Sequence, residues 1–406
     1  MKKILSVITV ICLLLSAAVI PVSASGSASY PFILVHGMMG WGENAEGQHE
    51  NPYWGYSQEN DIVKYLRSEG VEAYAPTMGG MSSAWDRACE LYAQLAGTVV
   101  DYGAAHSAKA GHARYGRDYT DRPIMGRAWD LSEKINLVSH SFGGPTVSIF
   151  TYLLANGAQE EIAAAPEDCS ELFKGGHADA VFSVTTLESP HNGSTIANLL
   201  YDTKLPVYMV AFIINVMGTQ ANPAIDFMMD QWGVTADPAT GETAKFDPAA
   251  IIKLAKSNDH CAYDMSLQGA KELEKYTAVD SVYYFSYAAD CTEKGALGLT
   301  VMNEQAGKSI LGFSGRIIIM LAGHTYGGVK TDKSWAANDG MVPVPSALYP
   351  NNAENNHTDY AQEGMAVEPG IWYVMPVVQG GTHGFGISGK EVLSFWDTLT
   401  DRINNI

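Results

Sequence analysis

The segment INLVSHSFGG, residues 135–144, decides how this chain folds. Its first five residues form a short run typical of a buried strand, and Pro145–Leu154 behind it has the composition of a helix. Ser141 stands at the junction, where a tight turn forces a serine into a strained backbone conformation and exposes its hydroxyl. Small residues must stand two places before and after it. Ser139 and Gly143 meet this condition, although glycine is usual at the first place. The segment therefore predicts a nucleophilic serine.

Runs of apolar residues elsewhere predict the other strands of a sheet. They are Phe32–Val35, Glu72–Pro76, Val181–Leu187, Ser281–Tyr287 and Ile371–Val378. A helical pattern over Glu59–Ser68, with Gly70 as its stop, separates the first two strands. Short apolar runs that alternate with helices are typical of parallel strands buried on both faces. The sequence thus predicts a mostly parallel central sheet with helices on both faces, the arrangement of the α/β-hydrolase fold.

The loop after the first predicted strand reads His36-Gly37-Met38. In this fold, that loop donates one backbone N–H group to the oxyanion that forms when the serine attacks, and the residue after the serine donates another. A helix that begins at the serine directs further N–H groups toward the same point. The expected donors are the amides of Met38 and Phe142.

The acid and the base are expected after the serine, in that order along the chain. His383 follows the last predicted strand in a glycine-rich loop, which is where the base belongs. His357 lies in an Asn-rich segment and is expected on a solvent-exposed loop. Two acids remain candidates by position. Asp290 follows a predicted strand, and Asp339 lies in a turn-forming Asn-Asp-Gly tripeptide.

Length, charge and the N-terminal residues limit which classes of protein this chain can belong to. The chain has 406 residues with 47% hydrophobic content, enough for one large core. Its formal net charge of −19 repels phosphate backbones and anionic lipid, so we expect no nucleic-acid partner. Residues 1–25 resemble a signal peptide, with Lys2 and Lys3 before an apolar run and small residues at its end. We expect a secreted, extracellular protein with one domain over residues 26–406 and no membrane anchor after cleavage.

Four cysteines follow the predicted signal peptide, namely Cys89, Cys169, Cys261 and Cys291. None of them forms a CxxC pair, which argues against a cysteine-ligated zinc site. An even number in a secreted protein permits two disulfides without requiring them.

Several unusual strings resemble those of the Gram-positive secreted lipases of the staphylococcal and thermophilic-bacillus group. They are His36–Gly42, Ser83–Glu90, Val100–His106, Gly111–Arg117, Ser183–Thr186, Pro190-His191, Asp230–Gly233 and Asn338–Gly340. The resemblance runs from about residue 31 to residue 385. It implies a zinc-containing α/β-hydrolase lipase, with Asp339 as the catalytic acid and His383 as the base.

A metal site is expected in an insertion at about residues 82–130. His106 and His112 are six residues apart, so a regular helix does not present them on one face, but a loop can bring them together. The resemblance implies that both histidines bind zinc with Asp86, and that Asp259 is the fourth ligand with His260 as its rival. Four protein ligands leave no open position, so the zinc is expected to be structural.

The same group often carries a calcium site just after the catalytic histidine. Here that region reads Gly384–Lys390, with Phe385 and Lys390 near the places of the expected acidic ligands. Calcium requires oxygen ligands, mostly carboxylates. We therefore expect no calcium at this place.

A lid is expected at about residues 200–232. Leu205–Met217 (LPVYMVAFIINVM) is uncharged and too short to span a membrane. Such a segment is either a buried core helix or a lid that covers an apolar pocket in water and turns toward lipid. Its place along the chain matches the lid of the lipases named above.

Taken together, these residues predict a secreted serine ester hydrolase, a triacylglycerol lipase or carboxylesterase, that forms an acyl-enzyme on Ser141 at an oil–water interface. A short-chain carboxylesterase able to act on polymeric esters is an alternative, because the sequence does not set pocket depth. A peptidase would use the same residues. A non-catalytic binding module of this fold is the alternative of another class.

Overall fold

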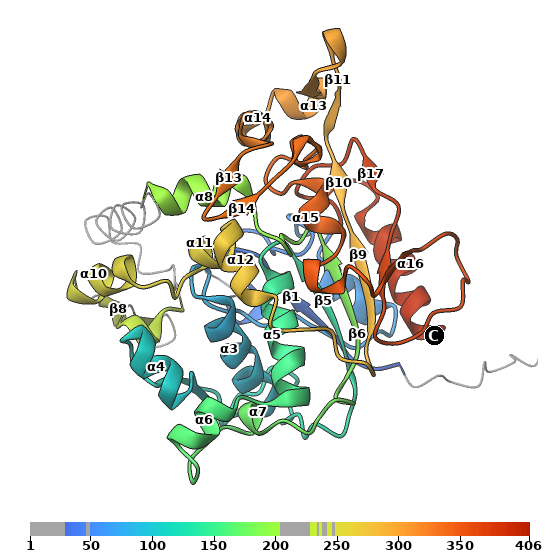
Figure 1. Ribbon diagram of the computed structural model, residues 1–406. Helices are drawn as coiled ribbons and strands as arrows, with labels where there is room; N and C mark the ends of the chain where they lie inside the picture. Colours follow the sequence, from blue (N-terminus) through green and yellow to red (C-terminus); the bar gives the residue numbers. More distant parts are fainter. Residues whose placement is uncertain (1–28, 46–48, 204–227, 234, 238–241, 246–247) are drawn as a thin grey trace, which may run out of the picture.

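A seven-stranded sheet forms the centre of the part of the chain that the structure describes (Figure 1). In the computed structural model, that part comprises residues 29–45, 49–203, 228–233, 235–237, 242–245 and 248–406. The predicted signal peptide and the apolar run of the predicted lid, 205–217, lie outside these residues.

The strand order of the sheet is β15-β16-β9-β6-β5-β1-β2, and every neighbouring pair is parallel. The strands are β1 (Phe32–Val35), β2 (Ala73–Tyr74), β5 (Ile135–His140), β6 (Val181–Leu187), β9 (Tyr283–Tyr287), β15 (His357–Asp359) and β16 (Trp372–Val374). The predicted parallel sheet is therefore confirmed. Parallel strands end at the same edge of the sheet, so the residues that follow β1, β5 and β6 gather there.

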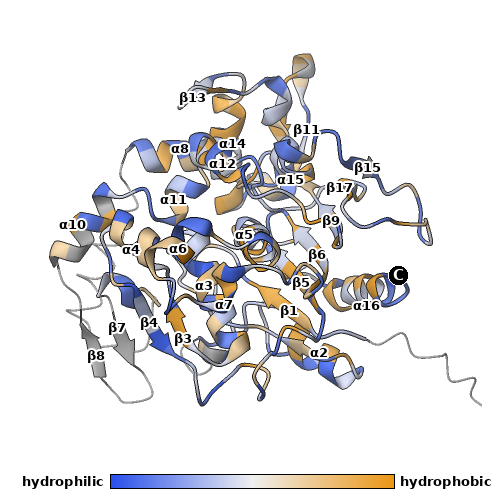
Figure 2. Cartoon of the chain, turned by 60° about the horizontal axis from the view of Figure 1, so that its bottom comes forward, coloured by the Kyte–Doolittle hydropathy of each residue, from blue (hydrophilic) through white to orange (hydrophobic). Residues whose placement is uncertain are grey.

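Helices cover both faces of this sheet (Figure 2). The first face carries α3 (Ala84–Ala96), α5 (Gly143–Asn156) and α7 (Glu171–Lys174), and the second carries α2 (Ile62–Ser68) and α16 (Val392–Asn404). Strand β1 shows why both layers are needed. Ile33 and Val35 belong to the core under α3 and α5, whereas Phe32 and Leu34 belong to the core under α2 and α16. All four side chains are fully buried, as a central parallel strand requires.

Shorter elements complete the described chain. The helices are α4 (Ala104–Ala110), α6 (Gln159–Ala164), α8 (Thr195–Asp202), α10 (Pro248–Lys256), α11 (Cys261–Asp264), α12 (Leu267–Leu273), α13 (Glu304–Gly307), α14 (Ile310–Leu321) and α15 (Val344–Leu348). The two-stranded sheets pair β3 (Val99–Asp101) with β4 (Tyr115–Asp118), β7 (Thr235–Asp237) with β8 (Glu242–Lys245), β10 (Ala289–Asp290) with β17 (Val378–Gln379), β11 (Thr292–Lys294) with β12 (Thr300–Met302), and β13 (Thr325–Tyr326) with β14 (Val329–Lys330).

Two predictions near the C-terminus were wrong, one of a strand and one of a loop. The run Ile371–Val378 is not one strand, because β16 ends at Val374 and β17 begins at Val378 in another sheet. Pro376 lies in the gap and has no backbone N–H group to donate to a ladder. His357 is not on an exposed loop. It begins the edge strand β15, and its ring stacks on Tyr349 with centroids 3.6 Å apart.

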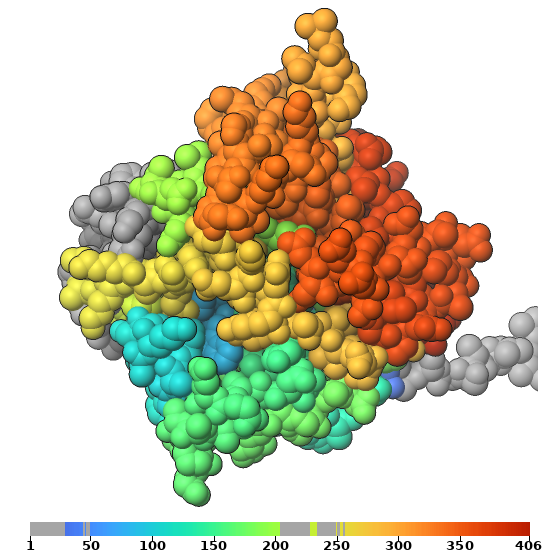
Figure 3. Space-filling model, in the orientation of Figure 1, coloured from blue at the N-terminus to red at the C-terminus, as the bar shows by residue number. Residues whose placement is uncertain are grey.

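The segment from β11 to α14 projects from the rest of the molecule at the top of Figures 1 and 3. It carries exposed apolar side chains, namely Leu297, Leu299, Val301, Ile310, Phe313 and Met320. Of these, Ile310, Phe313 and Met320 lie on α14 at helical spacing. No described helix is both long and apolar enough to cross a membrane. All four described cysteines are free thiols.

Candidate active site

Ser141 lies in the sharp turn between β5 and α5, with a φ of 54°, a conformation that side chains other than glycine rarely adopt. The turn is held because the Ser141 amide donates to the Leu187 carbonyl at 2.9 Å. Gly143 must be glycine, because a Cβ atom there would lie 2.3 Å from the carbonyl oxygen of Val35. The same atom would lie 3.2 Å from the Cβ of Ser139, a tight contact that the absence of a Cβ at Gly143 avoids. The predicted strand, turn and helix are therefore confirmed.

His383 and Asp339 meet this serine in a continuous hydrogen-bonded series. The Nε2 atom of His383 lies 2.8 Å from the Ser141 hydroxyl, and its Nδ1 atom lies 2.8 Å from Oδ2 of Asp339. The other oxygen of Asp339 accepts the amides of Met341 and Val342 at 2.8 and 2.7 Å. The Asn-Asp-Gly turn therefore orients the carboxylate, and the carboxylate orients the imidazole.

The structure separates the two acids that position alone left open. Asp290 uses its carboxylate to accept the amide and hydroxyl of Thr292 at 2.8 and 2.6 Å, away from His383. Asp339 is 1% exposed and lies against the imidazole. Of the two, only Asp339 contacts His383.

The two predicted amide donors lie beside the serine. Met38 follows Gly37, at which an added Cβ would lie 2.8 Å from the Cβ of Ser141. Phe142 is the N-cap of α5. Among the described residues, neither the Met38 nor the Phe142 amide donates to a backbone or side-chain acceptor. Both N–H groups are thus available to an oxyanion formed on a substrate bound at Ser141.

Arg87, which sequence reasoning did not single out, holds the loop that carries Met38. Its guanidinium is fully buried and donates to the carbonyls of His36 and, at 3.0 Å, Gly79, and to the hydroxyl of Thr146 at 3.0 Å. Burial lowers the pKa of Arg87 to about 10, so the group stays charged at neutral pH. A buried cation satisfied by backbone carbonyls fixes the path of that loop.

Tyr53 and His140 form a second support that sequence reasoning missed. The amide of Gly37 donates to the Tyr53 hydroxyl at 3.1 Å, and this hydroxyl lies 2.6 Å from Nδ1 of His140. The Nε2 atom of His140 lies 3.0 Å from the carbonyl of His383. If Tyr53 donates to Nδ1, then Nε2 carries the proton and donates to His383. Burial lowers the pKa of His140 well below its usual value, which keeps its ring neutral.

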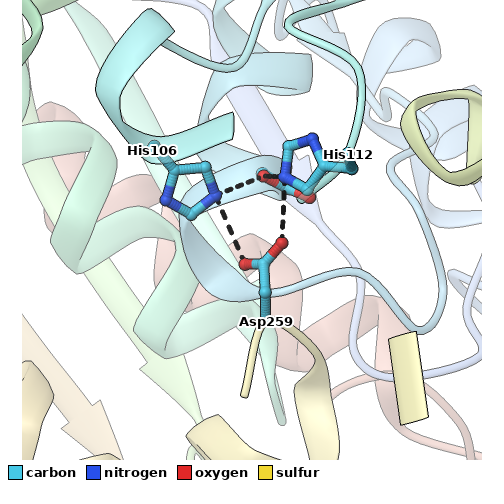
Figure 4. Close-up of side chains that lie close together, drawn as sticks. His106, His112 and Asp259 are labelled. Atoms are coloured by element: carbon cyan, nitrogen blue, oxygen red, sulfur yellow. Dashed lines mark hydrogen bonds and ion pairs between the residues drawn. The ribbon is translucent and has the colours of Figure 1, made fainter. Parts of the chain in front are cut away.

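The predicted metal ligands converge from separate elements (Figure 4). Asp86 comes from α3, His106 from α4, His112 from the loop after α4, and Asp259 from the loop after α10. One ligand atom of each lies within 4.8 Å of the others. The Nε2 atom of His106 lies 3.0 Å from Asp86 Oδ1 and 3.3 Å from Asp259 Oδ1, and Nε2 of His112 lies 3.0 Å from Asp259 Oδ2.

The donor set fits a tetrahedral cation such as zinc. His112 Nε2 and Asp259 Oδ2 lie 3.0 Å apart, and both are buried without a hydrogen-bond partner in the described chain. Burial and repulsion from Asp259 raise the pKa of Asp86, which a cation would reverse. The second oxygen of Asp86 accepts from Gln231 at 2.7 Å. The rival ligand His260 lies outside this set, since its Nδ1 atom accepts the amide of Tyr263 as the cap of α11.

Comparisons with known proteins place this chain in a family. The family described as "Lipase-like, C-terminal domain" matches residues 28–402. Lipase 2 of Staphylococcus aureus is 36% identical over 392 residues, which are 93% of this chain and 54% of that protein. The chain therefore spans about half the length of the curated relatives it matches.

Solved structures agree. EstA from Clostridium botulinum is 32% identical, with a TM-score of 0.79 over 94% of this chain and 88% of that chain. Staphylococcus hyicus lipase is 28% identical, with a TM-score of 0.75 over 93% of this chain and 96% of that chain. The resemblance read from the sequence is thus confirmed, and the chain belongs to the lipase-like C-terminal domain family.

Proposed function

We propose that this chain is a serine ester hydrolase, a triacylglycerol lipase, in which Ser141 is the nucleophile, His383 the general base and Asp339 the acid. One observation carries the proposal. His383 joins the other two residues, since its Nε2 atom lies 2.8 Å from Ser141 Oγ and its Nδ1 atom lies 2.8 Å from Asp339 Oδ2. The names of the relatives and structural neighbours, Lipase 2 and Staphylococcus hyicus lipase, support the same activity.

The mechanism follows from these positions. His383 Nε2 takes the proton of the Ser141 hydroxyl as the oxygen attacks the ester carbonyl. Asp339 stabilises the imidazolium that forms and keeps the ring in the tautomer that presents a free Nε2. The amides of Met38 and Phe142 donate to the oxyanion. The protonated His383 then protonates the leaving alcohol. In the second half of the reaction, His383 takes a proton from the water that attacks the acyl-enzyme and gives it to the Ser141 oxygen as the acid leaves.

Asp86, His106, His112 and Asp259 would hold a zinc ion, and we assign it a structural role. Four protein ligands leave no open position, so when bound the ion ties α3, α4 and the loop after α10 together. We further propose that no calcium binds in the segment after His383, where Phe385 and Lys390 replace carboxylates.

We assign the enzyme to an oil–water interface outside the cell. The exposed apolar side chains of α14 and of the β11–β12 hairpin support this, because large apolar groups gathered on one projection favour contact with lipid. Residues 1–25 are assigned to a signal peptide and residues 26–406 to one domain. Within that domain, about 82–130 is assigned to the metal-binding insertion and about 200–232 to the lid.

Hydrolysis of p-nitrophenyl esters from C2 to C16 by the mature chain tests the proposal, with Ser141→Ala as the control. Turnover of long acyl chains that disappears in the control supports a lipase. Turnover confined to short chains would keep the mechanism but replace the lipase with a short-chain carboxylesterase, and polymeric esters would then be the next substrates to assay. Absence of turnover in folded, zinc-loaded protein would overturn the proposal.

A further inference from the structure

Glu188 stands at the end of β6, next to the strand that carries Ser141. It has a φ of 52°, a strained conformation for a side chain of this size, and its side chain is fully buried. A hydrogen bond from the Glu188 amide to the Tyr287 carbonyl, 2.8 Å long, stabilises this backbone conformation. Strained residues in a well-packed site often serve its function.

The carboxyl of Glu188 lies against the catalytic histidine. One of its oxygens, one ring nitrogen of His140 and one ring nitrogen of His383 lie within 4.8 Å of one another. Its Oε2 atom lies 3.3 Å from Nε2 of His140, whereas Oε1 is buried without a hydrogen-bond partner among the described residues. An unpartnered buried carboxyl oxygen costs free energy and is kept in few places without a use.

A metal ion does not account for this cluster. Both ring nitrogens of His383 are engaged by Ser141 and Asp339. Both ring nitrogens of His140 also have partners, because Nδ1 lies 2.6 Å from the Tyr53 hydroxyl and Nε2 lies 3.0 Å from the His383 carbonyl. All four ring nitrogens of the two histidines are therefore engaged, and the carboxyl is the group whose role remains to be assigned.

Two acids thus flank one imidazole. Burial, together with repulsion from Asp339, raises the pKa of Glu188 well above its usual value, although the Phe385 amide opposes this shift. Two neighbouring carboxyls resist carrying two charges, so one holds the charge while the other stays protonated. Loss of the charge on Asp339 removes this repulsion and so lowers the pKa of Glu188, although burial continues to raise it.

We propose that Glu188 is a positioning residue for His383, a second acid that takes over the stabilisation of the imidazolium when Asp339 does not carry the charge. The inference rests on the proposed function and names a further residue in the same site. Among the described residues, the ionisable groups around Glu188 are His140, His383, Asp339, Tyr53 and Cys291. All of them except Asp339 remain when Asp339 is replaced.

A double-mutant cycle tests this role. We expect Asp339→Ala to keep esterase activity at least about ten-fold above that of Asp339→Ala/Glu188→Gln, a larger loss than Glu188→Gln causes when Asp339 is present. The matched control is Glu90→Gln, another buried glutamate, which accepts from Gly79 and Tyr102 rather than approaching His383. Its effect should add to that of Asp339→Ala without coupling.

The pH profile of Asp339→Ala gives a second readout, which does not require the double variant to fold. Glu188 must lose its proton before it can stabilise the imidazolium, so the acid limb of kcat should lie at higher pH than in the unchanged protein. An unshifted limb, or a cycle without coupling, would overturn the role of Glu188. If the unchanged protein itself shows no Ser141-dependent hydrolysis, the proposed function fails instead, which keeps the two failures distinct.

Discussion

The guanidinium of Arg87 donates a hydrogen bond to the backbone carbonyl of His36, which joins helix α3 to the loop after β1. The same helix carries Asp86, a ligand of the proposed metal site. One turn of α3 therefore supports both the proposed oxyanion donor Met38 and the metal cluster. Asp86 and Arg87 are adjacent in sequence, so one helix positions a proposed metal ligand and the group that holds the oxyanion loop.

Arg87→Lys should lower kcat more than it raises KM. Lysine keeps the charge but cannot donate at once to His36, Gly79 and Thr146, so the amide of Met38 loses its fixed position. Loss of one oxyanion donor costs about 100- to 1,000-fold in kcat, and we expect Arg87→Lys to reach the lower part of that range. Steady-state kinetics on one ester measure this. Lys64→Arg, at an exposed position of α2, is the control, and a loss seen only in KM would contradict the expectation.

Ser141→Gly should be more stable than Ser141→Ala, although both variants should lose about 10⁶-fold in kcat. Both lack the hydroxyl, so their difference isolates the backbone. Glycine adopts a φ of 54° without strain, whereas alanine does not, and the free energy of unfolding should differ by about 1 kcal/mol. Urea unfolding of the two variants measures this difference. Equal stabilities would show that the turn is not strained.

Removal of zinc should lower the melting temperature. A ligand present at a thousand-fold excess over its dissociation constant stabilises the folded state by about 4 kcal/mol, which corresponds to a shift on the order of 10 °C. Asp259→Asn should reproduce this shift, and the control Asp290→Asn should not. Metal analysis should give one zinc per chain, and a calcium-selective chelator should leave activity unchanged. A chelated protein that melts like the loaded one would exclude a structural metal.

Acid should destabilise the fold through buried histidines. Burial lowers the pKa of His191 to about 3 and those of His36 and His140 well below 6.5. The unfolded chain therefore binds more protons than the folded one below pH 6.5. Stability is fully present above that pH and falls as the pH drops toward 3.

His191→Gln isolates one of these protons, because glutamine can replace the contact of His191 with the Thr186 hydroxyl at 3.0 Å but does not titrate. Between pH 4.5 and 6, the free energy of unfolding of the unchanged protein should fall more steeply than that of His191→Gln, by about 1.4 kcal/mol per pH unit. Urea unfolding across this range measures both slopes. Parallel slopes would mean that His191 is protonated in the folded state.

The sequence predicted what local patterns determine. Strand β1 has the predicted bounds, because a four-residue apolar run buried on both faces carries its own signal. Strand β15 was missed because His-Thr-Asp has no apolar pattern, and it is a strand only through its pairing with β16. The division of the C-terminal run at Pro376 depended on which of two sheets each half joins.

The site divides in the same way. Ser141 and His383 stand in local sequence patterns, whereas Asp339 could be preferred to Asp290 only through the family resemblance. Glu188 carried no signal, since a glutamate after an apolar strand is most often solvated. The role proposed for Glu188 depends on its proximity to His383, which lies almost two hundred residues further along the chain. Tertiary proximity of this kind is invisible to periodicity and spacing.

The parallel sheet has a consequence for how the chain reaches its fold. Strand β1 pairs with β5, and β6 with β9, and each pairing joins segments about a hundred residues apart. No hairpin can nucleate such a sheet, and these two pairings contribute only after large loops have closed, which slows folding. Partly folded forms expose unpaired strand edges for a long time and aggregate. The four free cysteines form no disulfide that would limit unfolding. For such a chain, the working lifetime is the inverse of the unfolding rate, which the height of the unfolding barrier sets.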